Sequence, residues 1–314
     1  MDNLPDLARL VLDRFAKPRE RPSDDKHRSE TYGMGLAITR QLYDMQRGDS
    51  PALRLSAAGR CARANAYAIS GTPKDGKELD GRSRVTFAMG DVAELLIVHS
   101  LAETIGEVGG GRYSLQQAGA DQQKVWLFLE EDIDPIPGHP DGFICRDGIP
   151  WALLEVKSTS SFGFNKAMKA LEAGECPWGR DESYWWQSQA YMAALDLPLM
   201  GVVMLSKDSG MVLSFWLEQD DEFIDLFTSH VRMSHLPPEE VPRVLPDGTQ
   251  LKPREDWHKS RPGVMNRRHG ELSWRCRFCA WHTPCWSAEG LRKSVSRDYR
   301  GAPALALHVG RGDE

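Results

Sequence analysis

Two carboxylates and a lysine stand in a segment whose pattern is otherwise that of two strands. The segment GHPDGFICRDGIPWALLEVKS, Gly138–Ser158, carries Asp141, Glu155 and Lys157. Asp147-Gly148 is a hairpin turn signal, and the apolar run that ends in Glu155 is typical of a buried strand. Such a strand needs a reason to hold a carboxylate and an ammonium group two residues apart.

The hairpin register predicts that the two carboxylates are neighbours. Residues that face each other in an antiparallel hairpin have numbers with a constant sum. A three-residue loop over 147–149 therefore places Asp141 beside Glu155. Lys157 then lies on the same face of the sheet as Glu155, because side chains alternate along a strand.

This arrangement has the parts needed for phosphodiester hydrolysis. Adjacent buried carboxylates repel each other unless a cation joins them, and hard divalent ions such as Mg²⁺ or Mn²⁺ prefer oxygen ligands. A lysine beside them can orient or deprotonate a water, or neutralise charge that develops on a phosphate. The alternative is a surface hairpin with ordinary polar residues.

These residues resemble the motif of the PD-(D/E)XK nuclease superfamily. Pro140-Asp141 followed by Glu155-Val156-Lys157 matches its pattern, and the expected order of elements fits its αβββαβ core. The resemblance covers roughly residues 85–205. It implies that Asp141 and Glu155 bind the metal and that Lys157 positions and activates the attacking water.

Two further pieces of the resemblance lie on predicted helices. Gly90 and Glu94 form a Gly-x-x-x-Glu pattern where the RecB-type branch commonly has His as a metal ligand, which implies that Glu94 is a third ligand. QSQAY resembles the Gln-x-x-x-Tyr motif, carried here by Gln187 and Tyr191. In the family this helix lines the site and touches DNA; the alternative is a core helix with two polar residues.

Three of the six cysteines gather in CRFCAWHTPC as Cys276, Cys279 and Cys285. This C-x₂-C-x₅-C run is a strong metal signal. Three thiolates need a fourth partner. His282 would complete a local Cys₃His zinc site, and Cys61 would complete a Cys₄ site.

A resemblance to one branch of the RecB-like nucleases favours the second arrangement. AddB and the CRISPR-associated exonucleases hold a [4Fe–4S] cluster with one Cys before the nuclease core and three after it. LSAAGRCARANAYAISG resembles the upstream element, which implies a cluster held by Cys61, Cys276, Cys279 and Cys285. Such a cluster would tie the two ends of the chain together around the core. A structural zinc ion is the alternative, and Cys145 and Cys176 are expected to take no part.

The charge of the chain is unevenly distributed. Its 314 residues carry a net charge of −6, which as a whole does not indicate nucleic-acid binding. Basic residues nevertheless gather between positions 252 and 277, where they form either a solvated loop or a track for a phosphate backbone. They are Lys252, Arg254, Lys259, Arg261, Arg267, Arg268, Arg275 and Arg277.

The pattern of elements predicts an α/β fold with a mixed central sheet flanked by helices. By resemblance this is a restriction-endonuclease-like PD-(D/E)XK core with a helical N-terminal part and a cysteine-rich C-terminal region. We expect four parts: a helical and flexible segment (1–50), the nuclease core with the upstream Cys (51–235), a basic and cysteine-rich region that closes on the core (236–299) and a flexible tail (300–314). The predicted helices are 4–16, 34–47, 84–106, 182–197 and 221–233, with a short one around Cys61. The predicted strands are 123–130, 143–145, 151–156, 201–207 and 211–217.

These observations together predict a metal-dependent DNA nuclease. The resemblance implies an exonuclease on DNA ends or single strands, in recombination, repair or phage DNA processing. A non-catalytic DNA-binding or adaptor module of the same fold, and an endonuclease, are the alternatives. No phosphate-binding Gly-x-x-x-x-Gly-Lys-Ser/Thr loop is present, so unwinding would need a helicase or recombination partner. With no apolar run near the ~20 residues of a membrane span and no signal-peptide pattern, we expect a cytoplasmic protein.

Overall fold

The computed structural model describes residues 4–16, 53–75, 81–118, 122–252, 257–261, 264–267, 274–277 and 279–286. The α-helices are α1 (Leu7–Ala16), α3 (Ala62–Ile69), α4 (Gly81–Thr104), α5 (Ser161–Glu172), α6 (Ser183–Leu195), α7 (Phe223–Ser234), α8 (Trp274–Arg277) and α9 (His282–Trp286), with 3₁₀ turns η1 (Leu55–Ala57) and η2 (Ile105–Gly110). The strands are β1 (Tyr113–Gln116), β2 (Val125–Leu127), β3 (Ile136–Gly138), β4 (Gly142–Arg146), β5 (Ile149–Thr159), β6 (Leu199–Ser206), β7 (Val212–Glu218), β8 (Trp257–Arg261) and β9 (Val264–Arg267).

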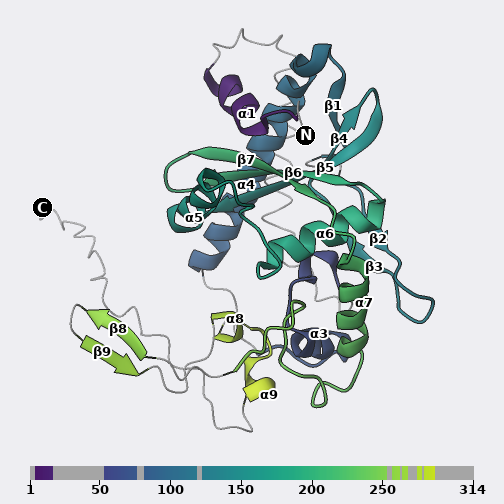
Figure 1. Ribbon diagram of the computed structural model, residues 1–314, viewed down its shortest axis with the longest axis vertical. Coiled ribbons are helices and arrows are strands. Elements are labelled where there is room, and N and C mark those ends of the chain that lie inside the picture. Colours follow the sequence, from purple (N-terminus) through teal and green to yellow (C-terminus); the bar gives the residue numbers. More distant parts are fainter. Residues whose placement is uncertain are drawn as a thin grey trace, which may run out of the picture.

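A five-stranded mixed sheet forms the centre of the molecule (Figure 1). The strand order is β1-β4-β5-β6-β7, and every neighbouring pair is antiparallel except β5 and β6, which are parallel. A parallel pair needs a crossover connection, and here α5 and α6 provide it. The predicted mixed sheet flanked by helices is therefore confirmed.

The two faces of β5 belong to different layers of the core. Ala152, Leu154 and Val156 pack with residues of α1 and α4. Leu153 on the opposite face joins the core that contains side chains of α6 and α7. Because Glu155 alternates with Leu154 and Val156, its side chain points into the α6 layer. The strand is buried on both faces, which explains its nearly continuous apolar sequence.

The hairpin has the predicted register, but for a different reason. Its loop has two residues, Asp147 and Gly148, and both have positive φ (53° and 82°), as a type I′ turn requires. Trp151 is then an extra residue in β5, opposite the step between Ile144 and Cys145, and it shifts the register by one. From there Gly142 pairs with Leu154, which brings the preceding Asp141 to Glu155. The predicted three-residue loop is wrong, while the predicted neighbours are right.

Two predicted segments differ from the structure. The first strand of the central sheet is β1, a short half-buried segment without an apolar run, and not the predicted strand at 123–130. Only β2 forms there, and it pairs with β3 in a separate two-stranded sheet, where prolines limit how far the ladder extends. The segment 158–182, where no helix was predicted, contains α5.

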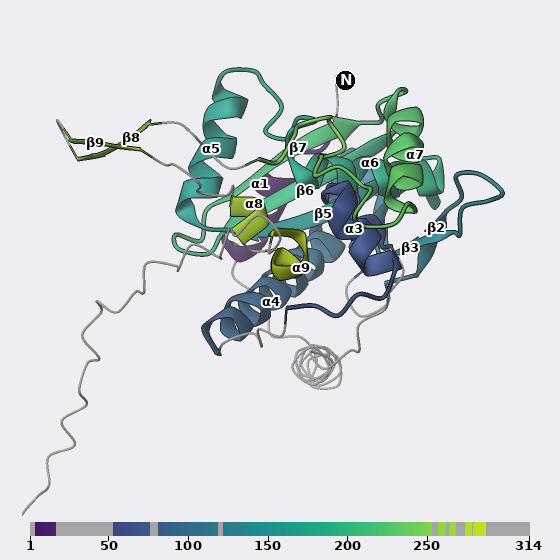
Figure 2. The same cartoon turned by 90° about the horizontal axis from the view of Figure 1, so that it is seen from below.

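The segment that carries Cys61 joins the C-terminal part of the described chain. The sequence predicted that Cys61 lies inside a short helix. In the structure, Cys61 is instead the N-cap residue of α3. α3 lies with α8 and α9 on one side of the central sheet, as two perpendicular views show (Figures 1 and 2). Segments that are more than 200 residues apart in the chain therefore meet here.

The helix that precedes the sheet is unusually apolar. Val85–Val108, which spans most of α4 and part of η2, has the length and composition of a membrane span, with a mean hydropathy of 1.5. The expectation that no run approaches this length is therefore wrong. One such helix among the described residues is weak evidence for a membrane span, because core helices pass the same test; here Ile97 and Leu101 pack in the core beside β5.

Some predictions fall outside the described residues. The predicted helix at 34–47, the tail at 300–314, and Arg254 and Arg268 of the basic run lie there. The first helix begins at Leu7, three residues later than predicted. The proposed division into four parts stays a prediction.

Candidate active site

Asp141, Glu155 and Lys157 lie together where β4 begins and β5 passes it. Asp141 directly precedes β4, and its Oδ2 accepts a hydrogen bond of 2.7 Å from the backbone N–H of Val156. Lys157 Nζ forms an ion pair with Glu155 Oε1. The strand pairing described above produces this arrangement, because it joins the start of β4 to the middle of β5.

Glu155 is a buried carboxylate with one oxygen left over. Its side chain is 1% exposed. Oε1 accepts the Nε2–H of Gln187 at 2.7 Å and contacts Lys157, whereas Oε2 has no hydrogen-bond partner among the described residues. A buried anionic oxygen without a partner is costly, so this atom points to a missing cation or solvent ligand.

Glu94, on α4, is a third carboxylate close to Asp141 and Glu155. Its Oε1 accepts the Nε2–H of Gln122 at 2.7 Å. Burial and then the charge of Glu155 raise the pKa of Glu94 to about 7. Burial, Glu155 and Glu94 also raise the pKa of Asp141 well above its ordinary range. These effects require the three carboxylates to be close enough to repel one another.

The site carries a permanent positive charge on Lys157. Burial alone lowers the pKa of this ammonium, but Glu155 and Asp141 outweigh burial and raise it above 10.5. A lysine held in the charged form is suited to neutralise negative charge and to orient water.

The helix α6 forms one wall of the site. Gln187 contacts Glu155 directly. The Tyr191 hydroxyl accepts the backbone N–H of His139 at 3.4 Å, and its ring lies against Gly138, where an added Cβ would meet Tyr191 Cε1 at 2.5 Å. Tyr191 therefore packs under the chain that leads to Asp141, and its contact is with the backbone of that chain.

The sequence reading missed two polar or aromatic residues at this site. Gln122 lies in the loop before β2, where no pattern marks it. The ring of Tyr184 lies 5.4 Å from Lys157 Nζ. Tyr184 is three residues before Gln187, so helical spacing from the Gln-x-x-x-Tyr motif was a signal that could have found it.

The carboxylates suit a divalent cation by charge and donor type. Three carboxylates beside one ammonium leave an excess of negative charge, and Glu155 Oε2 has no partner among the described residues. Oxygen donors of this kind are those that Mg²⁺ and Mn²⁺ prefer. Within the described ranges, however, no three His, Cys, Asp or Glu side chains form a group that could hold a metal ion in the present arrangement.

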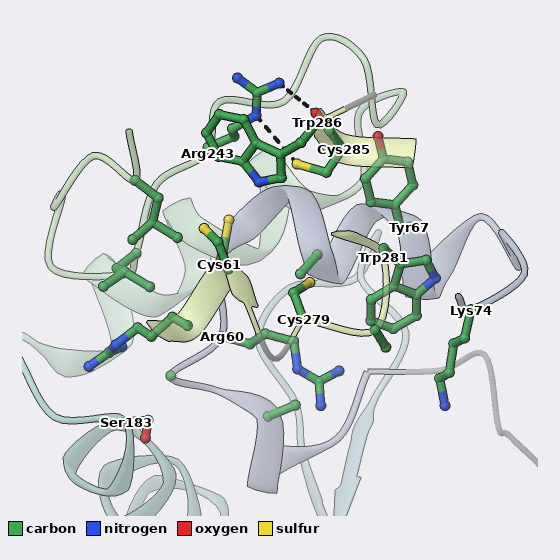
Figure 3. Close-up of a pocket in the computed structure, with 18 of the residues that line it drawn as sticks. Arg60, Cys61, Tyr67, Lys74, Ser183, Arg243, Cys279, Trp281, Cys285 and Trp286 are labelled. Atoms are coloured by element: carbon green, nitrogen blue, oxygen red, sulfur yellow. Dashed lines mark hydrogen bonds between the residues drawn. The ribbon is translucent and has the colours of Figure 1, made fainter. Parts of the chain in front are cut away.

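The four cysteines singled out from the sequence line one cavity of about 440 Å³. Cys61, Cys279 and Cys285 face this space together with aromatic and basic side chains (Figure 3). Cys276 lines it as well, and His282 does not. Trp281 and Trp286 also line it, and both are buried. Cys61 therefore shares this cavity with the three C-terminal cysteines, while their role as metal ligands stays a prediction.

These thiols are partly or fully buried among aromatic and basic side chains. Burial raises the pKa of Cys61 to about 11 and also raises the pKa of Cys279. Arg243 donates from Nε to Cys285 Sγ at 3.3 Å and stacks on Trp286 at 3.8 Å. Among the described residues, the cysteines as placed do not form a group that could hold a metal ion either.

Cys145, Cys176 and Arg275 have partners other than a metal site. Cys145 is buried in the main core, and Cys176 Sγ lies 3.1 Å from the carbonyl oxygen of Trp178, so both lie away from the cavity. Of the basic run, Arg275 donates to the carbonyl of Asp181 at 2.6 Å and thereby ties α8 to the loop before α6.

Comparison with known proteins yields only distant similarity. No family model and no curated protein matches the chain. Among solved structures, an alkaline exonuclease (LHK-Exo) from Laribacter hongkongensis is 16% identical with a TM-score of 0.36, over 61% of this chain and 89% of that one. A phage-related exonuclease from Haemophilus somnus 129PT is 13% identical with a TM-score of 0.35, over 60% and 94%. The protein SSO0001 is 12% identical with a TM-score of 0.42, over 81% and 94%. Similarity at this level leaves the functional argument to the site itself.

Proposed function

We propose that the protein is a metal-dependent nuclease that hydrolyses DNA phosphodiester bonds, acting as an exonuclease on DNA ends or single strands. The observation that carries this proposal is the buried Glu155, with one oxygen unpartnered among the described residues, held between two other carboxylates and a charged lysine. An ordinary packing surface gives no reason to bury this set of charges. The resemblance of the hairpin to the PD-(D/E)XK motif supports DNA as the substrate.

Glu94, Asp141 and Glu155 would hold the divalent ion. When bound there, Mg²⁺ or Mn²⁺ supplies Lewis-acid activation of water and of the phosphate. Gln122 and Gln187 orient two of the carboxylates through their amide hydrogens. Lys157 places a positive charge where negative charge grows on the phosphate oxygens as water attacks phosphorus and the leaving oxygen departs.

Digestion of linear and circular single-stranded DNA with Mn²⁺ tests the proposal. The wild type is compared with Glu155→Gln and with Glu218→Gln, which changes an exposed carboxylate at the end of β7 on the same sheet. We expect the wild type and Glu218→Gln to degrade linear DNA only, and Glu155→Gln to be inactive. Cleavage of both forms would mean an endonuclease. Equal behaviour of wild type and Glu155→Gln would favour a DNA-binding or adaptor module.

We also propose that Cys61, Cys276, Cys279 and Cys285 hold a [4Fe–4S] cluster that ties α3 to the segment of α8 and α9. The support is that all four thiols line one cavity, although they come from opposite ends of the chain. Thiolate sets of this kind hold such clusters, and metal binding stabilises the fold that brings the ligands together.

A duplex substrate would in addition need a helicase partner to unwind it.

Anaerobic purification followed by iron, sulfide and zinc analysis tests the cluster. We expect a brown protein with iron and sulfide in equal amounts, and loss of both in Cys61→Ala. Cys176→Ala is the matched control, because Cys176 lies outside the cavity. A colourless protein that contains zinc would replace the cluster with the structural zinc site.

A further inference from the structure

Tyr184 presents an exposed ring at the proposed active site. It lies in the first turn of α6, three residues before Gln187, so the two side chains share one face of the helix. The centroid of its ring is 5.4 Å from Lys157 Nζ, yet the residue is 43% exposed. The ring therefore lies beside the proposed catalytic lysine and is open to solvent.

The ring of Tyr184 is held from behind by other aromatic side chains. Its centroid is 5.2 Å from that of Trp178, at an interplanar angle of 39°. Trp178 is buried and meets Phe215 edge-on, with centroids 5.1 Å apart and an angle of 89°. Because the support belongs to the core, the orientation of Tyr184 is set before any ligand arrives, which lowers the entropic cost of binding.

An exposed ring beside a phosphate-binding group suits an unpaired nucleotide. Aromatic side chains bind single strands by stacking on bases, whatever the base identity. A phosphate next to Lys157 carries nucleotides on both sides, and one of their bases comes within reach of a ring 5.4 Å away. Inside a duplex the faces of that base are already covered by its neighbours, so only an unpaired or terminal base is available.

We infer that Tyr184 is a nucleobase-stacking residue, which binds the nucleotide next to the scissile phosphate and makes the site select unpaired DNA. This inference rests on the proposed nuclease function and names the form of DNA that the site takes.

The contact of the Tyr184 ring with Lys157 suggests a second possible role, which the experiment must distinguish from base stacking. A ring near an ammonium attracts it by a cation–π interaction, so Tyr184 could act only by positioning Lys157. A positioning residue affects the rate of the chemical step at saturating substrate. A stacking residue affects chiefly the affinity for DNA.

The test uses Tyr184→Leu, which removes the ring, and Tyr184→Phe, which keeps it. Phe128→Leu is the control, because Phe128 is an aromatic residue that is 75% exposed just after β2 and outside the site. The probes are short single-stranded oligonucleotides with 2-aminopurine at the 5′ or the 3′ end. Affinity is measured with Ca²⁺ in place of Mn²⁺ to slow hydrolysis. Single-turnover rates at saturating DNA are measured with Mn²⁺.

We expect Tyr184→Leu to weaken binding about tenfold, within the range for loss of one base–aromatic stack. The single-turnover rate of this variant should fall by less than about threefold, since the ring is not part of the chemical step. Stacking also quenches 2-aminopurine fluorescence, so one of the two probes should lose its quenching in Tyr184→Leu and keep it in Tyr184→Phe. Phe128→Leu should match the wild type throughout.

Two results would overturn the inference while the nuclease proposal survives. In the first, Tyr184→Leu binds the probes as tightly as the wild type. In the second, its rate at saturating DNA falls as far as that of Lys157→Gln, which would assign Tyr184 to positioning. If the wild type neither binds nor cleaves DNA with any divalent ion, both proposals fall. Circular dichroism of each variant identifies loss of folding.

Discussion

The Glu94 carboxyl makes the stability of the metal-free protein depend on pH in a direction that is unusual for an acid. Its pKa is about 7 in the folded protein, against an ordinary value of 4.5, because burial and Glu155 disfavour its charge. Between these two values the folded state holds a proton that the unfolded state has lost. The contribution of Glu94 to stability therefore falls as pH rises through this window, by about 1.4 kcal/mol per pH unit, and levels off above it.

Glu94→Gln removes this dependence and keeps the shape of the side chain. The amide oxygen can still accept the hydrogen bond from Gln122. The change in the free energy of unfolding follows from the difference between the folded and unfolded pKa values and is on the order of 3 kcal/mol. We expect Glu94→Gln to stabilise the metal-free protein by about this amount at pH 8 and to have little effect at pH 5.

Urea unfolding in EDTA at pH 5 and pH 8 measures this difference. Glu218→Gln, at an exposed position, controls for the general effect of losing a carboxylate. Addition of Mn²⁺ at pH 8 should stabilise the wild type more than Glu94→Gln, because the ion needs the charged carboxylate. The reasoning is refuted if Glu94→Gln changes stability equally at both pH values, or if it destabilises the metal-free protein at pH 8.

Three further substitutions probe the same site. Lys157→Gln should lower the single-turnover rate about a hundred- to a thousandfold while Mn²⁺ affinity is retained. If the variant instead loses Mn²⁺ affinity and reaches the wild-type rate at saturating Mn²⁺, the electrostatic role of Lys157 is contradicted. Gln187→Leu removes the amide donor to Glu155 and should lower the free energy of unfolding by about 1–3 kcal/mol in urea; an unchanged midpoint would mean that solvent replaces the amide. Gly138→Ala places a Cβ 2.5 Å from Tyr191 Cε1 and should destabilise the protein by about 1–3 kcal/mol, and no change in melting temperature would show that the ring moves aside.

The local sequence was sufficient for the main features of the hairpin. Alternating and continuous apolar runs predict β4–β7 because burial on one or both faces of a sheet selects them. The Asp147-Gly148 turn was visible because few residues adopt positive φ at two successive positions. The extra residue in β5, Trp151, was not visible, since a single extra residue in a strand leaves no compositional mark. The register nevertheless came out right for Asp141 and Glu155.

Elements whose role depends on distant partners were harder to predict. The apolar run at 123–130 has a strand pattern, yet Val125 and Leu127 of β2 pack in the core that includes α6, and the strand pairs outside the central sheet. The position next to β4 is taken by β1, whose four residues are only half-buried and carry no clear pattern. Which segment pairs with β4 is settled by packing of the whole chain, to which local propensity contributes little.

The sequence by itself determined which chemistry is available: carboxylates and a lysine on a buried strand, and a set of soft thiol ligands near the C-terminal end. Those signals are local, because residue type and spacing along one element set donor type and side-chain direction. Only the tertiary structure decided that Glu94 reaches Glu155, that Gln122 and Tyr184 belong to the same site, and that Cys61 lines a cavity with thiols from the other end of the chain. These relations join segments that are distant in sequence, and their proximity follows from the packing of α3, α4 and α6 with the rest of the fold.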